Sequence, residues 1–122
     1  MIEELITYLR KNTPYNYCFD GTSTLKDCVV YNYYETLNDG IKSNYRLELH
    51  IIVKGRTEKS LLKVEEIRET INNLIITKAD NKLTDRIRKV YLNGGGQLTD
   101  DNTDTIHQFI YYDILYVKEK ER

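Results

Sequence analysis

The hydrophobic pattern changes its period within the stretch 45–76, and this change predicts a strand that leads directly into a helix. Apolar residues first alternate with mostly polar ones, at Tyr45, Leu47, Leu49, Ile51 and Val53. After Gly55 they recur at helical spacing, at Leu61, Val64, Ile67, Ile71 and Leu74. A strand and a helix joined this tightly pack face to face, so we expect Leu47, Leu49 and Ile51 to lie in the core against the apolar side of the helix.

The chain before this stretch predicts a short helix and two strands. The apolar residues of the N-terminal segment lie on one side of a helix that Pro14 ends: Ile2, Leu5, Ile6 and Leu9. An aromatic, extended segment at 15–19 predicts a short edge strand, and a turn cluster at 20–23 follows it. A second strand, 27–36, is rich in valine and tyrosine. Asp39-Gly40 then favours a hairpin, with 37–44 as its extended and mobile tip.

The chain after the helix predicts a loop and two more strands. A polar loop at 77–85 precedes a strand at 87–92, which Asn93 and three glycines end. A polar, acidic run then reaches Thr105, and a long last strand follows at 106–117. This order of elements predicts a single α+β domain over 1–122. Its one mixed or antiparallel sheet of about four or five strands has the long helix on one face, together with the short N-terminal helix.

The last strand is apolar on both of its faces. One face shows Ile106, Ile110, Tyr112, Ile114 and Tyr116. The other shows Phe109, Tyr111, Leu115 and Val117. Because one helical layer covers only one face of a sheet, we expect something else to cover the second. The candidates are the short N-terminal elements and another subunit.

Charge and composition exclude several classes of function. The 18 basic and 19 acidic side chains leave a formal charge of -1, and no segment gathers basic residues into a stripe that would neutralise phosphates, so we expect no sequence-specific nucleic-acid binding. The unbroken apolar runs fall far short of the roughly 20 residues that cross a bilayer, so we expect no membrane partner. The start of the chain does not resemble a secretion signal, which predicts synthesis in the cytoplasm and reduced Cys18 and Cys28.

Two segments resemble ligand loops without matching them. The glycines Gly94, Gly95 and Gly96 suggest a phosphate loop, but an acidic run and a strand follow them instead of a helix, so a plain hairpin loop is the better interpretation. Asp100, Asn102 and Asp104 have the spacing of the first three ligands of a calcium loop. The two positions that should then hold glycine and glutamate are Thr105 and Tyr111, which favours a solvated acidic loop. We therefore expect no cofactor and no metal.

No local motif predicts catalysis. His50 and His107 lie on predicted strands, and neither they nor the two cysteines have zinc-ligand spacing. A Cys-His nucleophile pair has no local support. Glu35 and Glu48 lie inside the hairpin strands, but no lysine stands two residues after Glu48, as a metal-dependent nuclease site often has. The sequence therefore favours a protein that is not an enzyme.

The order of elements as a whole resembles a known family. The chain has a short N-terminal helix, an aromatic strand, a long hairpin and the strand Tyr45-Arg-Leu-Glu-Leu-His-Ile-Ile-Val-Lys54. That strand runs straight into a long amphipathic helix at 58–75, followed by a glycine-containing loop and a closing strand. This pattern, over 1–117, is similar to the tail terminator and minor capsid proteins of long-tailed phages and to other head-tail joining proteins of this size.

The resemblance implies a structural role without catalytic residues. Such proteins form a ring, usually of six subunits, that caps the tail tube and contacts the neck, so the implied partners are further copies, the tail tube protein and a neck or connector protein. The implied location is the cytoplasm on synthesis and then the virion. The expected interface residues are Asn38, Asp39, Gly40, Gly94, Gly95, Gly96, Asp100, Asp101, Asp104, Phe109 and Tyr111. The alternative is a small enzyme or a regulatory ligand-binding domain.

Overall fold

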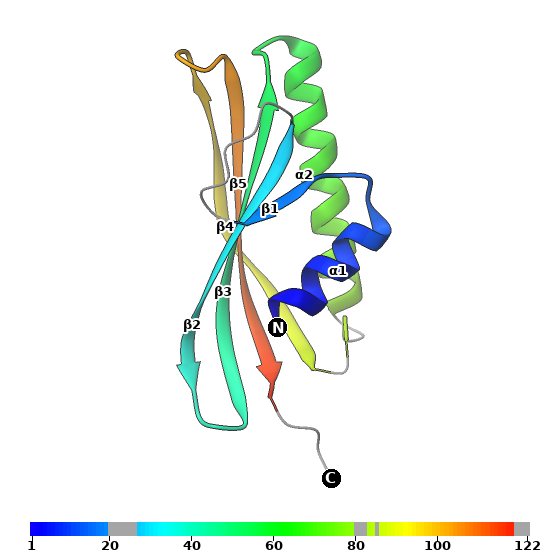
Figure 1. The fold of residues 1–122 in the computed structure, drawn as a ribbon, viewed down its shortest axis with the longest axis vertical. Helices are drawn as coiled ribbons and strands as arrows, with labels where there is room; N and C mark the ends of the chain where they lie inside the picture. Colours follow the sequence, from blue (N-terminus) through cyan, green and yellow to red (C-terminus); the bar gives the residue numbers. More distant parts are fainter. Residues whose placement is uncertain (20–26, 80–82, 85, 119–122) are drawn as a thin grey trace.

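A computed structural model describes residues 1–19, 27–79, 83–84 and 86–118 of the chain (Figure 1). The elements are α1 (Ile2–Asn12), β1 (Tyr17–Phe19), β2 (Cys28–Asn38), β3 (Lys42–Lys54), α2 (Glu58–Ala79), β4 (Ile87–Asp100) and β5 (Thr105–Val117). The α+β class and the order of elements are as the sequence predicts. The turn cluster predicted at 20–23 lies outside the described residues.

The strands form one mixed sheet in the order β1-β2-β3-β5-β4. Only β1 and β2 are parallel, and the three other neighbouring pairs are antiparallel. The short edge strand β1 contacts only the first part of β2, from Val29 to Tyr31. Helix α2 connects β3 to the edge strand β4 and so skips one position in the sheet. The chain returns through β5, which fills that position between β3 and β4.

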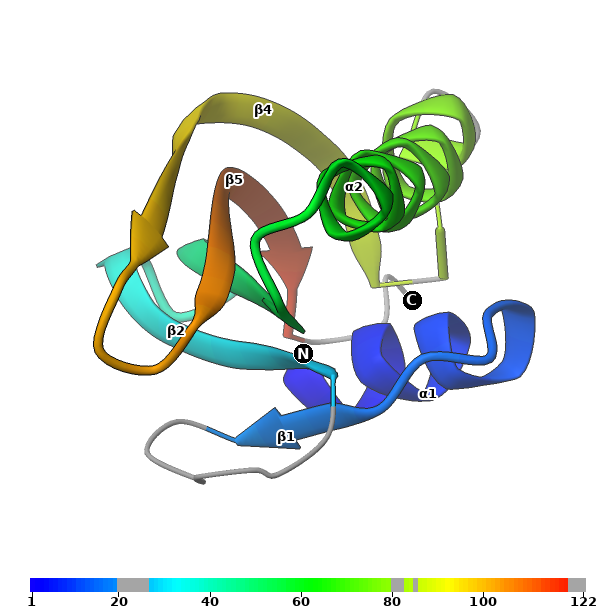
Figure 2. The same ribbon diagram turned by 90° about the horizontal axis from the view of Figure 1, so that it is seen from above.

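Both helices lie on one side of the sheet (Figure 2). Leu5 and Leu9 of α1 and Val64, Ile71 and Ile75 of α2 are fully buried against it. The sheet residues under the helices are Leu47, Leu49, Ile51, Val53, Ile106, Ile110, Tyr112 and Ile114. Burial of each such side chain stabilises the fold by about 1.5–3 kcal/mol relative to leaving it exposed. Most of the apolar core lies in this single layer between the sheet and the helices.

The predicted register of the central strand and helix is confirmed with one correction. Leu47, Leu49 and Ile51 all point into the core. Leu61, however, is 38% exposed, so the prediction that it packs against the strand was wrong. Hydrophobic period identifies the buried side of a helix but not the turn at which the covering sheet begins, and here burial starts one turn later, at Val64.

The prediction for the glycine segment was also wrong. Asn93 and the three glycines do not end a strand, because β4 continues through them to Asp100 and pairs with β5 along most of its length. The register shifts between Leu92 and Gly95, which indicates a β-bulge. A Cβ on Gly95 would lie 2.4 Å from the backbone oxygen of Phe109. Glycine is therefore needed here for a close approach between strands, and not for a turn.

The hairpin between β2 and β3 is shorter at its tip than the sequence predicts. Leu37 and Asn38 still pair with Asn44 and Ser43, so only 39–41 turn the chain. The side chain of Asn38 accepts the amide of Gly40 at 2.8 Å, and that of Asp39 accepts the amide of Lys42 at 2.7 Å. These bonds fix the turn, in which Gly40 has a φ of 92°. The tip is therefore a tight turn and not the extended loop that the sequence predicts.

Candidate functional site: the helix-free face of the sheet

We call the sheet face opposite the helices the open face. Alternation along β2, β3 and β5 places on it Val30, Asn32, Tyr34, Arg46, Glu48, His50, Ile52, His107, Phe109, Tyr111, Asp113 and Leu115. None of these side chains is fully buried. Helix α1 packs on the other face beside α2, and β1 extends the sheet at its edge, so the described N-terminal elements do not cover this face. Cys28, Thr105 and Val117, which alternation places at the ends of the same face, are buried.

Aromatic and charged side chains are stacked along the middle of the open face. The rings of His50 and Phe109 lie on neighbouring strands with their centroids 4.2 Å apart and an interplanar angle of 21°. Phe109 also contacts Tyr111, at 6.4 Å between centroids. The guanidinium carbon of Arg46 lies 4.8 Å from the centroid of the Tyr111 ring, within the range of a cation–π contact. These contacts link the side chains into a continuous row along the open face.

A histidine pair lies at one end of this stack. Nε2 of His50 is 2.6 Å from Nδ1 of His107, and Nε2 of His107 is 2.7 Å from Oγ1 of Thr105. Burial, followed by repulsion from His107, lowers the pKa of the His50 imidazole to about 4. At neutral pH His50 is therefore uncharged, and the contact between the rings is a hydrogen bond in which one ring donates and the other accepts.

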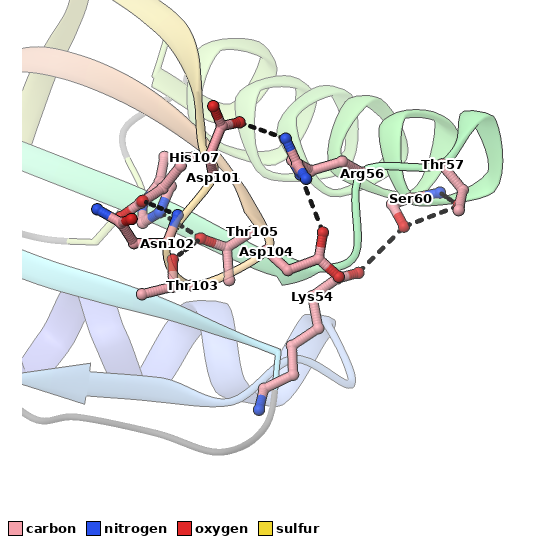
Figure 3. A network of polar contacts seen from close by, with 11 residues as sticks. Lys54, Arg56, Thr57, Ser60, Asp101, Asn102, Thr103, Asp104, Thr105 and His107 are labelled. Atoms are coloured by element: carbon pink, nitrogen blue, oxygen red, sulfur yellow. Dashed lines mark hydrogen bonds and ion pairs between the residues drawn. The ribbon is translucent and has the colours of Figure 1, made fainter.

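The acidic residues of the β4–β5 hairpin are held by Arg56 (Figure 3). Its Nε lies 2.9 Å from a carboxylate oxygen of Asp104, and its Nη1 forms an ion pair with Asp101. A backbone hydrogen bond adds to this network: the amide of Gly55 donates to the carbonyl oxygen of Asp104 at 2.6 Å. Hydrogen bonding to Asp104 and the charge of Asp101 raise the pKa of Arg56. This network ties the hairpin turn to the start of α2.

The same network bears on the calcium interpretation of this turn. Asp100 accepts the amide of Asn102 at 2.9 Å, and Asp101 and Asp104 face Arg56. These carboxylates therefore already have partners within the protein. Among the residues that the structure describes, no three His, Cys, Asp or Glu side chains are arranged to hold a metal ion.

A small cavity on the helix side contains a further pair of charged groups. It measures about 290 Å³ and lies beside the start of β2, between Pro14, Asn16, Asp27 and Lys63. Asp27 forms an ion pair with Lys63 and accepts the amide of Lys54 at 2.9 Å. Burial alone would raise the pKa of Asp27, but these bonds outweigh it and lower the pKa. The charges in the cavity wall thus neutralise each other.

The expected interface residues fall in four separate places. Asn38, the last residue of β2, lies with Asp39 and Gly40 at one end of the sheet, and Asp101 and Asp104 are in the turn at the other end (Figure 1). Gly94, Gly95 and Gly96 lie between them on the edge strand β4, and Asp100 is its last residue. Phe109 and Tyr111 are the ones that the structure brings together, in the stack on the open face.

The sequence did not reveal the histidine pair, the Arg46–Tyr111 contact or the Arg56 network. Each joins residues of β3, or just after it, to residues of β5 or its turn. These segments are adjacent only because β5 inserts beside β3. The one available signal was the strict alternation of both strands, which assigns His50, His107 and Phe109 to a face once the strand order is known.

Comparison with known proteins does not add a family to this picture. No protein-family model matches the chain, and no curated protein matches it at a significant level. The described part of the chain contains no helix with the length and apolar character needed to cross a membrane.

Proposed function

We propose that the protein is a structural phage protein, a tail terminator or head-tail joining protein that assembles as a ring at the end of the tail tube. The observation that carries this proposal is the open face. It presents stacked rings and aliphatic side chains that no described element of the subunit covers. Such a surface suits contact with another protein, because aromatic side chains give a large contact area with polar groups at their tips.

The use of the polar groups supports an assembly role over a catalytic one. Arg56, Asp101 and Asp104 fasten a turn, and Asp27 and Lys63 neutralise each other. A general acid or base needs a titratable side chain positioned toward a bound substrate. The partners of these charged groups are instead other parts of the fold, so they act to hold it together.

The two hairpins also suit a ring subunit. They reach opposite ends of the sheet, and their turns are fastened by side-chain hydrogen bonds and ion pairs (Figure 1). A ring that caps a tube presents one end to the tube and the other to the neck. A subunit with an ordered turn at each end has a separate contact surface for each partner.

The experiment that tests the proposal uses the intact chain and assembled tail tubes of the same phage. The purified protein is mixed with the tubes, and the tube ends are imaged by electron microscopy. We expect a ring of added density at one end of each tube. Tube ends that stay bare at saturating protein would contradict the proposal and favour a small ligand-binding or enzymatic domain. Light scattering on the free protein, run in parallel, shows whether the ring forms without the tube.

A further inference from the structure

The sheet ends in two edges that differ from each other. On one side β4 pairs with β5 and with no other described strand. On the other side β1 pairs only with Val29 to Tyr31, so β2 from Asn32 to Asn38 has no described strand on its outer side. The amide of Tyr33 donates at 2.9 Å to the side chain of its neighbour Asn32, as fits a strand edge without a partner. Both edges expose backbone groups that another strand can pair with.

The middle of each edge has few of the charged side chains and no proline that usually protect an edge from pairing. Natural sheets guard edges with lysines, prolines and other charges. Residues 90–99 of β4 contain no charged residue and no proline, and 32–38 of β2 contain one charge, Glu35. That charge is paired with Lys118 at 3.2 Å. Each edge does contain a β-bulge, which confines regular pairing to the stretches on either side of it.

Exposed apolar side chains gather at the same two edges. Among the described residues, the large apolar side chains exposed away from the edges are Leu61 and Leu62 of α2. The others belong to the short edge strand β1 (Phe19), to β2 and its hairpin (Tyr34, Leu37 and Ile41) or to β4 (Tyr91, Leu92 and Leu98). Apolar side chains beside unpaired backbone are the features of a strand that adds to another sheet.

Strand direction allows one subunit to continue the sheet of the next. In the sheet, β2 and β4 run in opposite directions, because three successive antiparallel pairings separate them. If β4 of one copy lies beside β2 of an equivalently oriented copy, the new pair is again antiparallel. Antiparallel pairing is the more stable arrangement per residue.

We propose that copies of this chain join by pairing the outer edge of β4 in one subunit with the outer edge of β2, from Asn32 to Asn38, in the next. The contact uses two different surfaces, so it is head-to-tail and closes into a ring when the rotation permits. The short strand β1 limits the contact to the part of β2 beyond Tyr31. This inference rests on the proposed ring function and names the surface that builds the ring. The open face then stays available for the tube or neck protein.

The test compares three double variants that make the same kind of change. Leu92→Lys/Leu98→Lys places charge on the β4 edge, and Tyr34→Lys/Leu37→Lys places it on the β2 edge. Leu61→Lys/Leu62→Lys, on α2, is the matched control. All six side chains are at least 38% exposed, so each variant keeps its fold, which circular dichroism checks. Self-association is followed by light scattering and native mass spectrometry over a wide range of protein concentration.

We expect both edge variants to lose self-association by at least tenfold and the α2 variant to associate like the natural chain. A mixture of the two edge variants is the decisive sample. Each then has one intact edge, so the mixture should form heterodimers and nothing larger. Edge variants that still associate, an α2 variant that is equally impaired, or a mixture without heterodimers would each overturn the inference. Rings at tube ends formed by the edge variants would overturn this inference alone and leave the proposed function standing.

Discussion

His50 and His107, 57 positions apart in the sequence, meet on the open face with Nε2 of one ring 2.6 Å from Nδ1 of the other. The contact crosses from β3 to β5, and His50 continues it into the stack with Phe109. His107 in turn contacts Thr105, beside the turn that Arg56 fastens. The histidine pair therefore connects the ring stack to the β4–β5 hairpin.

This pair predicts a specific dependence of stability on pH. Burial and then His107 lower the pKa of His50 from 6.5 to about 4 in the folded protein. In the unfolded chain the imidazole of His50 is protonated near its ordinary pKa of 6.5, whereas in the folded chain it stays neutral until about pH 4. The contribution of neutral His50 to the free energy of unfolding is complete above the pKa that His50 has in the unfolded chain, and it is lost as the pH falls toward 4. We expect His50→Phe, which keeps a ring against Phe109, to remove that part of the acid sensitivity.

The measurement is the free energy of unfolding by urea, at a series of pH values between 7 and 4, for the natural chain and for His50→Phe. The natural chain should lose more stability than the variant. The difference should stay below the limit for one proton, about 1.4 kcal/mol per pH unit, because a half-buried imidazole is partly screened by solvent. Parallel curves for the two proteins would show that His50 does not carry the effect.

The core prediction concerns Leu49, which is fully buried under α2. Leu49→Ala removes apolar contacts and leaves a cavity, so it should lower the free energy of unfolding by about 2–5 kcal/mol. Leu62→Ala is the matched control, because Leu62 is 62% exposed, and it should change stability by no more than about 0.5 kcal/mol. Urea unfolding monitored by circular dichroism measures both. Equal losses would mean that the strand register is wrong.

The glycine segment allows a comparison between neighbouring positions. A Cβ on Gly95 would lie 2.4 Å from the Phe109 carbonyl oxygen, whereas a Cβ on Gly96 would meet no atom within 4 Å. We expect Gly95→Ala to force β4 and β5 apart and to lower the free energy of unfolding by about 1–3 kcal/mol. Gly96→Ala should be neutral or slightly stabilising, because it restricts the unfolded chain. Thermal unfolding of the two variants tests this, and a reversed order would rule out the close approach.

Much of the fold was predictable because its signals are local. Alternation identified β3 and both faces of β5, and helical spacing identified α2. Pro14 and the apolar residues on one side of the N-terminal segment located α1. The structure adds that the helix carries Glu3 and Glu4 in its first turn and Arg10 and Lys11 in its last, which suits the helix dipole. Each of these signals depends on residues within about two turns or one strand of each other, which a sequence displays directly.

The errors arose where tertiary contacts decide the outcome. A run of glycines usually marks a turn, but the proximity of Phe109 makes a small residue necessary within β4. The histidine pair and the Arg56 network depend on β5 lying beside β3, an order that the sequence does not state. Phe109 and Tyr111 were chosen correctly as neighbours on one face, because alternation alone assigns residues two apart to the same side.

The acidic turn should not respond to calcium. Arg56 is already paired with Asp101 and Asp104, and Tyr111 stands where a calcium loop needs a bidentate glutamate. We expect millimolar calcium, and likewise a nucleotide, to leave the temperature of thermal unfolding unchanged. Differential scanning fluorimetry with magnesium as the ionic-strength control measures this. A rise of several degrees with calcium alone would require a site that forms by displacing Arg56.

The last prediction separates docking of the protein to the tube from ring formation. Phe109 lies between His50 and Tyr111 in the stack and is only partly buried, so Phe109→Glu should fold. A carboxylate there places an unpaired charge at the centre of the open face, where a tube or neck protein would exclude water. We expect the variant to bind tail tubes at least about thirtyfold more weakly, which corresponds to a loss of about 2 kcal/mol.

Leu62→Glu introduces the same charge on the exposed side of α2 and is the control for this docking experiment. Sedimentation of tail tubes with each variant measures docking, and light scattering measures self-association in the same samples. Because the edges of β2 and β4 are unchanged, Phe109→Glu should still associate with other copies while the tubes sediment without it. If Phe109→Glu docks as well as Leu62→Glu does, the open face is not the surface that meets the tube. A loss of self-association in Phe109→Glu would instead show that the open face, and not the two sheet edges, joins the copies.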